Sequence, residues 1–162
     1  TLLRLCEEIP TIVAIKDWCN DGMLHEKHIR VLRNLPRPVS VLTTHSAWLM
    51  SSLVMGCDGL LSGAGSVIAD LQVELWLAVQ SKDLSRAQKI NERIYPMIQA
   101  FYAPPFLDMH NRMKEVAVLL GRLPKAVVRP PLCKLPDSEI QILRAALKES
   151  GIGPVGAEKR AA

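Results

Sequence analysis

Three short apolar runs, each followed by a polar loop and then by a segment of helical periodicity, occupy the first half of the chain. The runs span residues 11–16, 38–43 and 58–62, and the helical segments span 24–35, 47–55 and 67–80. In the first run, four aliphatic residues follow one another without a polar residue between them, a pattern typical of a strand buried on both faces. This succession of strand, loop and helix predicts an α/β fold, with a parallel sheet and right-handed crossovers.

The second half of the chain is predicted to be helical, without further strands. Its apolar residues recur at spacings of three and four, in stripes that begin at Ile90, Met109 and Ile140. Ser138 and Gln141 match a capping box at the start of the last of these helices. Amphipathic helices of this kind bury one face against a neighbour, so we expect the helices to pack on one another.

Lys16 is the first candidate for chemistry, because it is the last residue of the first apolar run. Parallel sheets bind ligands beyond the carboxyl ends of their strands, so its amine is expected at the edge of a pocket. A free lysine has a pKa of about 10.4, and burial in apolar surroundings lowers that value and frees the amine to attack a carbonyl. The alternative is a lysine whose amine only extends into solvent from a strand end.

Composition and charge exclude several classes of function. The chain has 162 residues, a formal net charge of +4 and 4% aromatic residues, and its basic residues are scattered. These features argue against a nucleic-acid interface. No apolar run reaches the roughly 18 residues of a membrane span, so no membrane partner is expected either.

Metal and cofactor motifs are not found in the sequence. The four cysteines form no Cys-x-x-Cys pair, so neither a zinc site nor a disulfide framework is expected, and reduced thiols favour a cytoplasmic protein. His25 and His28 lack the spacing of a zinc-binding His-Glu-x-x-His motif and are predicted on a solvated helix face. Gly63 and Gly65 complete neither a dinucleotide fingerprint nor a phosphate-binding loop, so we expect no cofactor.

The order of motifs resembles that of a known family. The chain carries Ile-Val-Ala-Ile-Lys-Asp, then Gly-x-Asp-Gly-Leu-Leu-Ser, then Arg-x-Pro-Leu before a final helix. Over residues 1–152 this order is similar to the carboxy-terminal half of the dihydrodipicolinate synthase and N-acetylneuraminate lyase family. The resemblance implies a (β/α)8 TIM barrel of which this chain supplies about strands 6–8 plus a helical carboxy-terminal extension. It divides the chain into barrel residues 1–82, the helical extension 83–152 and a flexible tail 153–162.

The resemblance also implies an activity, that of a lyase or aldolase. Lys16 matches the family's lysine that forms a Schiff base with a 2-oxo acid such as pyruvate, which leads to aldol cleavage, addition or dehydration. Thr44 and His45 fall in a loop that contacts the far part of the substrate, and the backbone of Leu61 borders the bound 2-oxo acid. Members of the family are commonly homotetramers, so a homo-oligomer is expected.

Departures from the family's pattern leave more than one function open. The Gly-Thr-Thr-Gly-Glu loop and the catalytic tyrosine of the family belong to its amino-terminal half, so that half of the barrel is an expected partner of this chain. Tyr95 and Tyr102 are predicted on an outer helix and match no family motif. Thr44 and His45 stand where many members carry glycine and an acidic residue, which weakens the case for a dihydrodipicolinate synthase of lysine biosynthesis. The pattern is also compatible with a catalytically inactive half-barrel and with a ligand-sensing homologue.

Overall fold

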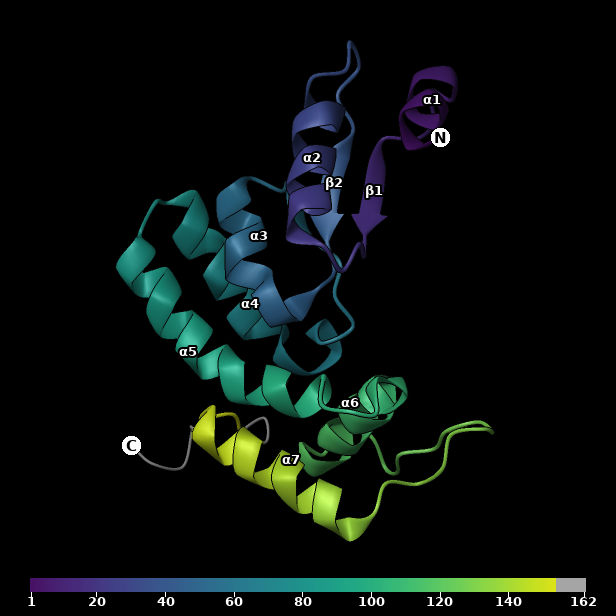
Figure 1. The fold of residues 1–162 in the computed structure, drawn as a ribbon. Coiled ribbons are helices and arrows are strands. Elements are labelled where there is room, and N and C mark those ends of the chain that lie inside the picture. The colour runs from purple at the N-terminus through teal and green to yellow at the C-terminus, as the bar shows by residue number, and fades with distance from the viewer. Residues whose placement is uncertain (154–162) are drawn as a thin grey trace.

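A parallel sheet with helices beside it forms the first half of the molecule, and three further helices form the second (Figure 1). The computed structural model describes residues 1–153. In chain order the elements are α1 (Leu2–Glu8), β1 (Ala14–Asp17), α2 (Gly22–Arg33), β2 (Ser40–Thr43), a 3-10 turn (Ser46–Trp48), α3 (Leu49–Met55), β3 (Gly59–Leu60), α4 (Gly65–Gln80), α5 (Leu84–Phe101), a second 3-10 turn (Phe106–Asp108), α6 (Met109–Leu119) and α7 (Asp137–Glu149). The predicted flexible tail lies outside the described residues, apart from Gly153.

The three strands are parallel and lie in the order β1-β2-β3. Ile15 is paired with Val41, and Thr43 with Leu60. The predicted parallel arrangement is therefore confirmed, although β3 is shorter than the run that indicated it. Because all three strands point the same way, their carboxyl ends lie along one edge of the sheet, where side chains from successive strand ends can meet.

The first strand is more exposed than its apolar sequence predicted. Ala14 and Lys16 are exposed, and Val13, just before the strand, is 67% exposed. The prediction of burial on both faces is thus wrong for this chain, because β1 forms the outer edge of the sheet and no element within residues 1–153 covers that face (Figure 1). Asp17 is buried beside α2, as expected from the alternation of side chains along a strand.

The hydrophobic core runs from the sheet into the helical half. Helix α4 packs on α5, and α5 and α6 both pack on α7. Leu75, Ile94, Phe101, Val116 and Leu143 lie fully buried in this core. Each large apolar side chain buried in this way contributes about 1.5–3 kcal/mol, so packing between the helices fixes their positions. None of the helices within residues 1–153 is long and apolar enough to cross a membrane.

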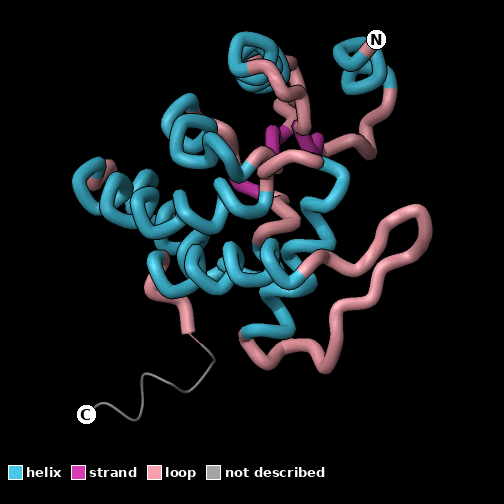
Figure 2. Tube along the Cα trace, turned by 60° about the horizontal axis from the view of Figure 1, so that its bottom comes forward, coloured by secondary structure: helices cyan, strands magenta, loops and turns pink. Residues whose placement is uncertain are grey.

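The last helix begins one residue before the predicted capping box. Pro136 occupies the N-cap of α7, and no side chain caps the helix there. The capping-box prediction is wrong because Ser138 lies inside the first turn, where Asp137 and Glu139 place negative charge near the helix amino terminus. The chain reaches α7 through a long loop after α6, which extends away from the helices (Figure 2).

Arg112 stabilises the loop between α5 and α6 through hydrogen bonds. Its side chain is only 2% exposed, and its Nε lies 2.9 Å from Oε2 of Glu139 on α7. The guanidinium also donates to four backbone carbonyl groups, those of Phe101, Ala103, Pro104 and Pro105. These bonds hold the segment on which Tyr102 and Phe106 return toward the sheet.

Candidate active site

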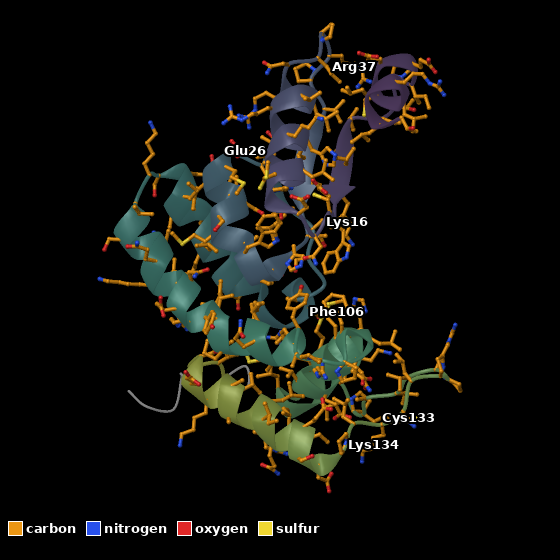
Figure 3. All side chains as sticks on the ribbon, in the orientation of Figure 1. Lys16, Glu26, Arg37, Phe106, Cys133 and Lys134 are labelled. Carbon is orange, nitrogen blue, oxygen red and sulfur yellow. The ribbon has the colours of Figure 1, made fainter. Side chains whose placement is uncertain are left out.

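A cavity of about 280 Å³ lies at the carboxyl ends of the strands. It is lined by residues that follow the strands and by residues of the helical half: Lys16, Trp18, Thr44, Gly63, Tyr102, Phe106, Met109, His110 and Met113. Figure 3 shows Lys16 at the end of β1 and Phe106 close to α6, on the same side of the molecule. Strand ends and an aromatic wall thus meet where the sequence predicted a pocket.

Lys16 takes the predicted place at the carboxyl end of a strand and faces the cavity. Its side chain is exposed and makes neither a hydrogen bond nor an ion pair with residues 1–153. The dry, apolar surroundings expected for a nucleophilic amine are therefore not supplied by this chain alone. The amine is free to reach a ligand in the cavity.

The three predicted substrate-binding residues lie next to one another but play different parts in the structure. Thr44 lines the cavity, and its Oγ1 donates a 2.6 Å hydrogen bond to the carbonyl oxygen of Leu61. His45 lies behind the lining, stacked on Trp18 at 4.9 Å between ring centroids and on Tyr102 at 5.5 Å. Burial lowers the pKa of His45, which keeps its ring neutral near neutral pH. The side chain of Leu61 is exposed and lies outside the cavity lining.

Tyr102 is a site residue that the sequence placed on an outer helix. It is the C-cap of α5 and points back to the loops after β2 and β3. Burial raises the pKa of Tyr102, an effect partly offset by hydrogen bonds with Ser46 and Ser62. The two serine hydroxyls bond to each other, and Gln72 Nε2 donates to Ser46 Oγ at 3.4 Å. This polar network holds the phenol as a neutral group on the floor of the cavity.

Asp17 is enclosed by hydrogen-bond donors on the opposite face of β1 from Lys16. Its Oδ2 accepts from Nδ1 of His25 at 2.8 Å and from Nδ1 of His28 at 2.9 Å, and its Oδ1 accepts from the backbone N–H of Cys19 at 2.8 Å. The predicted solvated face is wrong for His25, which is buried, because α2 lays this face against the end of β1. Burial raises the pKa of Asp17, but the hydrogen bonds from Cys19, His25 and His28 outweigh it and hold that pKa well below its ordinary value.

The same cluster contains donor atoms of the kind that bind metal ions. The ligand atoms of Asp17, Cys19 and His28 lie within 4.8 Å of one another. Burial and the nearby Asp17 carboxylate raise the pKa of the Cys19 thiol to about 12, so the protonated thiol is strongly favoured. The hydrogen bonds of Asp17 with Cys19 and His28 are sufficient to explain why these side chains lie together. We therefore assign the cluster a structural role, which is to position the end of β1 that carries Lys16.

We expect Asp17→Asn to destabilise the protein by roughly 2–4 kcal/mol, because the buried His25 and the partly exposed His28 lose a charged acceptor. The free energy of unfolding would be measured with urea near neutral pH. Asp21→Asn is the matched control, since Asp21 is exposed and asparagine caps a helix as well as aspartate does. Equal stability of the two variants would contradict the role given to Asp17.

The effect of Asp17→Asn depends on pH in a defined direction. A depressed pKa means that the folded state keeps Asp17 ionised after the unfolded state has begun to take up a proton near the ordinary value of 3.8. The stabilisation is therefore complete above that pH and is lost as the pH falls below it. The gap between wild type and variant should shrink in acid.

Comparison with known proteins decides the family. A profile of the dihydrodipicolinate synthetase family matches residues 1–150. The chain belongs to this family. Among curated members of the dihydrodipicolinate synthetase family, the 4-hydroxy-tetrahydrodipicolinate synthase of Symbiobacterium thermophilum is 28% identical over 152 residues, which is 94% of this chain and 49% of the relative. The enzyme of the same name from Oceanobacillus iheyensis is 28% identical over 149 residues, which is 92% of this chain and 48% of the relative.

Solved structures of the dihydrodipicolinate synthetase family share this fold. A monomeric dihydrodipicolinate synthase variant is 21% identical and has a TM-score of 0.83, with 92% of this chain and 48% of that chain covered. The Thermotoga maritima dihydrodipicolinate synthase is 22% identical with a TM-score of 0.81, over 91% of this chain and 49% of that one. The chain thus has the α/β fold of these proteins and spans about half the length of the relatives it matches.

Proposed function

We propose that this chain is the carboxy-terminal half of a (β/α)8 barrel. In this assignment β1, β2 and β3 are strands six, seven and eight, residues 1–82 belong to the barrel and residues 83–152 form a helical extension. Three observations support it: the strands are parallel, the chain covers about half of its relatives, and β1 leaves one edge of the sheet open. The amino-terminal half of the barrel would pair with β1 and cover Lys16.

We further propose that the protein is a Schiff-base lyase or aldolase that acts on a 2-oxo acid such as pyruvate. The observation that carries this proposal is the position of Lys16, at the carboxyl end of a strand and facing a cavity. Another member of the family, a prophage protein from E. coli, has been solved in complex with pyruvate. It is 23% identical, with a TM-score of 0.81 over 92% of this chain and 49% of that one.

The reaction follows from the chemistry of an amine and a ketone. The lone pair of Lys16 Nζ adds to the keto carbon, water leaves, and a protonated imine remains. The protonated imine draws electrons from the bonds of the carbon next to it. That neighbouring carbon can therefore lose a proton or a carbon substituent, and the electron pair left behind converts the imine to an enamine. The enamine then adds to an aldehyde or takes up a proton, and water releases the product from Lys16.

The remaining predicted residues have roles beside this centre. Thr44 would bind the far part of the substrate, because its side chain lines the cavity. His45 would act through the ring stack, where it supports Trp18 and Tyr102. The backbone of Leu61 would border the 2-oxo acid, and its carbonyl oxygen fixes Thr44.

A second candidate is the lysine-biosynthesis reaction itself. The curated relatives described above carry the name 4-hydroxy-tetrahydrodipicolinate synthase, which favours this activity. It would use the same lysine and the same imine, and differ in the aldehyde that the enamine attacks. Assay of the full-length protein with pyruvate and a panel of aldehydes, with detection of 4-hydroxy-tetrahydrodipicolinate among the products, distinguishes the two candidates.

The decisive experiment traps the imine. Borohydride added to the full-length protein with pyruvate is expected to reduce the imine to a stable adduct, which peptide mass spectrometry would locate on Lys16. Lys27, exposed on α2, is the internal control and should stay unmodified. An adduct elsewhere, or none, would overturn the mechanism.

The 162-residue chain alone gives a second arm of the same experiment. If the amino-terminal half of the barrel excludes water from the Lys16 amine, the chain alone should form little adduct. The chain alone should also self-associate, because the edge of β1 is unpaired. Ligand binding without turnover would instead favour the sensing homologue. A homo-oligomer, expected as a tetramer, and a cytoplasmic location complete the proposal.

A further inference from the structure

Four aromatic side chains from distant parts of the sequence meet beside Lys16. Trp18 follows β1, His45 follows β2, and Tyr102 and Phe106 lie between α5 and α6. The ring centroids of Trp18, Tyr102 and Phe106 are 5.8–6.3 Å apart in every pair. Contacts at these distances make one continuous aromatic surface rather than separate side chains.

This aromatic surface is open toward the cavity. Trp18 is 39% exposed and Phe106 is 47% exposed, and both line the cavity together with Tyr102. His45 closes the other side of the stack, with its ring only 20° from the plane of Trp18 and 13° from that of Tyr102. The tryptophan and tyrosine rings are therefore held in fixed planes, and a flat ligand can stack without rearranging them.

The other residues that line the cavity favour an uncharged group at the far end of the substrate. Lys16 is the one Lys, Arg, Asp or Glu among the described residues that line the cavity. Met109 and Met113 add polarisable, apolar surface on the α6 side. An ammonium at the far end of a substrate would find no carboxylate among these lining residues, and a carboxylate would have only His110 once Lys16 has formed the imine. An aryl group would find aromatic and thioether contacts.

We propose that the aldehyde part of the substrate carries an aromatic ring, which stacks on the surface formed by Trp18, Tyr102 and Phe106. This inference rests on the proposed Schiff-base function and names its substrate class, the 4-hydroxy-4-aryl-2-oxobutanoates. In the cleavage direction, the bond between the third and fourth carbons breaks, its electron pair passes to the imine as an enamine, and the 4-hydroxyl loses its proton. The third carbon then takes up a proton, and hydrolysis yields pyruvate and an aryl aldehyde.

Selectivity between two uncharged aldehydes tests the inference in the full-length protein. With pyruvate present, kcat/KM for benzaldehyde should exceed that for propanal, and Trp18→Ala and Phe106→Leu should each lower the benzaldehyde value roughly 3- to 10-fold. The propanal value should change less than about twofold, because that aldehyde gains little from stacking. Tyr95→Ala is the matched control, since Tyr95 is an exposed aromatic residue on α5 outside the cavity lining. An unchanged ratio in both Trp18→Ala and Phe106→Leu would overturn the inference.

A binding measurement separates this inference from the proposed function. Benzyl alcohol cannot form an imine, so saturation-transfer NMR should detect its binding to the Lys16→Ala variant and show weaker binding when Trp18→Ala is added. Pyruvate trapping that succeeds while benzyl alcohol does not bind would refute the aromatic subsite alone. Benzyl alcohol binding without any pyruvate adduct would refute the lyase and leave the aromatic subsite as a binding site only.

Discussion

Replacing Lys16 by arginine is expected to lower pyruvate turnover in the full-length protein by roughly 10³-fold or more. Arginine keeps the charge and much of the length of lysine, but its guanidinium stays protonated and is not a nucleophile. A variant of this kind removes imine formation with little change in the surface of β1. The expected loss is large because every later step of the proposed reaction passes through the imine.

Exchange of the methyl protons of pyruvate in heavy water measures this step without knowledge of the aldehyde. The enamine of pyruvate returns to the imine by taking up solvent deuterium, so wild-type protein should exchange these protons and Lys16→Arg should not. Lys27→Arg provides the control, because Lys27 is exposed on α2 and away from the cavity lining. Similar exchange by Lys16→Arg and wild type would show that another group carries the chemistry.

Replacing Arg112 by methionine is expected to reduce the free energy of unfolding by about 3–5 kcal/mol. The side chain of Arg112 is 2% exposed and satisfies four backbone carbonyl groups as well as Glu139. Methionine fills a similar volume but donates no hydrogen bond, so these carbonyl groups and the Glu139 carboxylate lose a partner. Unpaired polar groups of this kind in a buried place are costly.

Urea unfolding of the full-length protein measures the effect of Arg112→Met, and Arg86→Met on the exposed face of α5 is the control. The control should change the free energy of unfolding by less than about 0.5 kcal/mol. Because Arg112 holds the segment that carries Tyr102 and Phe106, the variant should also bind benzyl alcohol less well. Stability equal to that of Arg86→Met would mean that α5 and α6 are fixed by apolar packing alone.

Part of the candidate site follows from local sequence pattern. An apolar run that ends in Lys16, within three strand and helix units, placed the amine at a strand end and at the edge of a pocket, and the structure has it there. Thr44, which follows the second strand, also reaches the cavity. Thr44 was singled out by the family resemblance and not by local pattern, and its predicted contact with the substrate stays a prediction. Both positions lie at one edge because parallel neighbouring strands bring their carboxyl ends together whatever the side chains are.

Further parts of the site depend on residues that are far apart in the sequence. Tyr102 and Phe106 reach the cavity because the chain turns back after α5, and periodicity within α5 carries no information about that turn. His25 was predicted on a solvated face because its spacing from His28 matches no metal motif, whereas the fold brings it to a buried acceptor on Asp17, eight residues earlier in the chain. The exposure of β1 could not be read from its apolar residues, since it depends on which strand lies beside it.

Local patterns in the chain were enough to predict the order of strands and helices, the resemblance to the family and the position of Lys16 at a strand end. Side chains repeat every two residues in a strand and every 3.6 residues in a helix, and these periods can be recognised in short stretches of sequence. The packing of distant parts of the chain brings aromatic rings from three segments onto one surface and encloses Asp17 between two histidines. Such contacts arise from the packing of helices on the sheet, and no local pattern of residues specifies them.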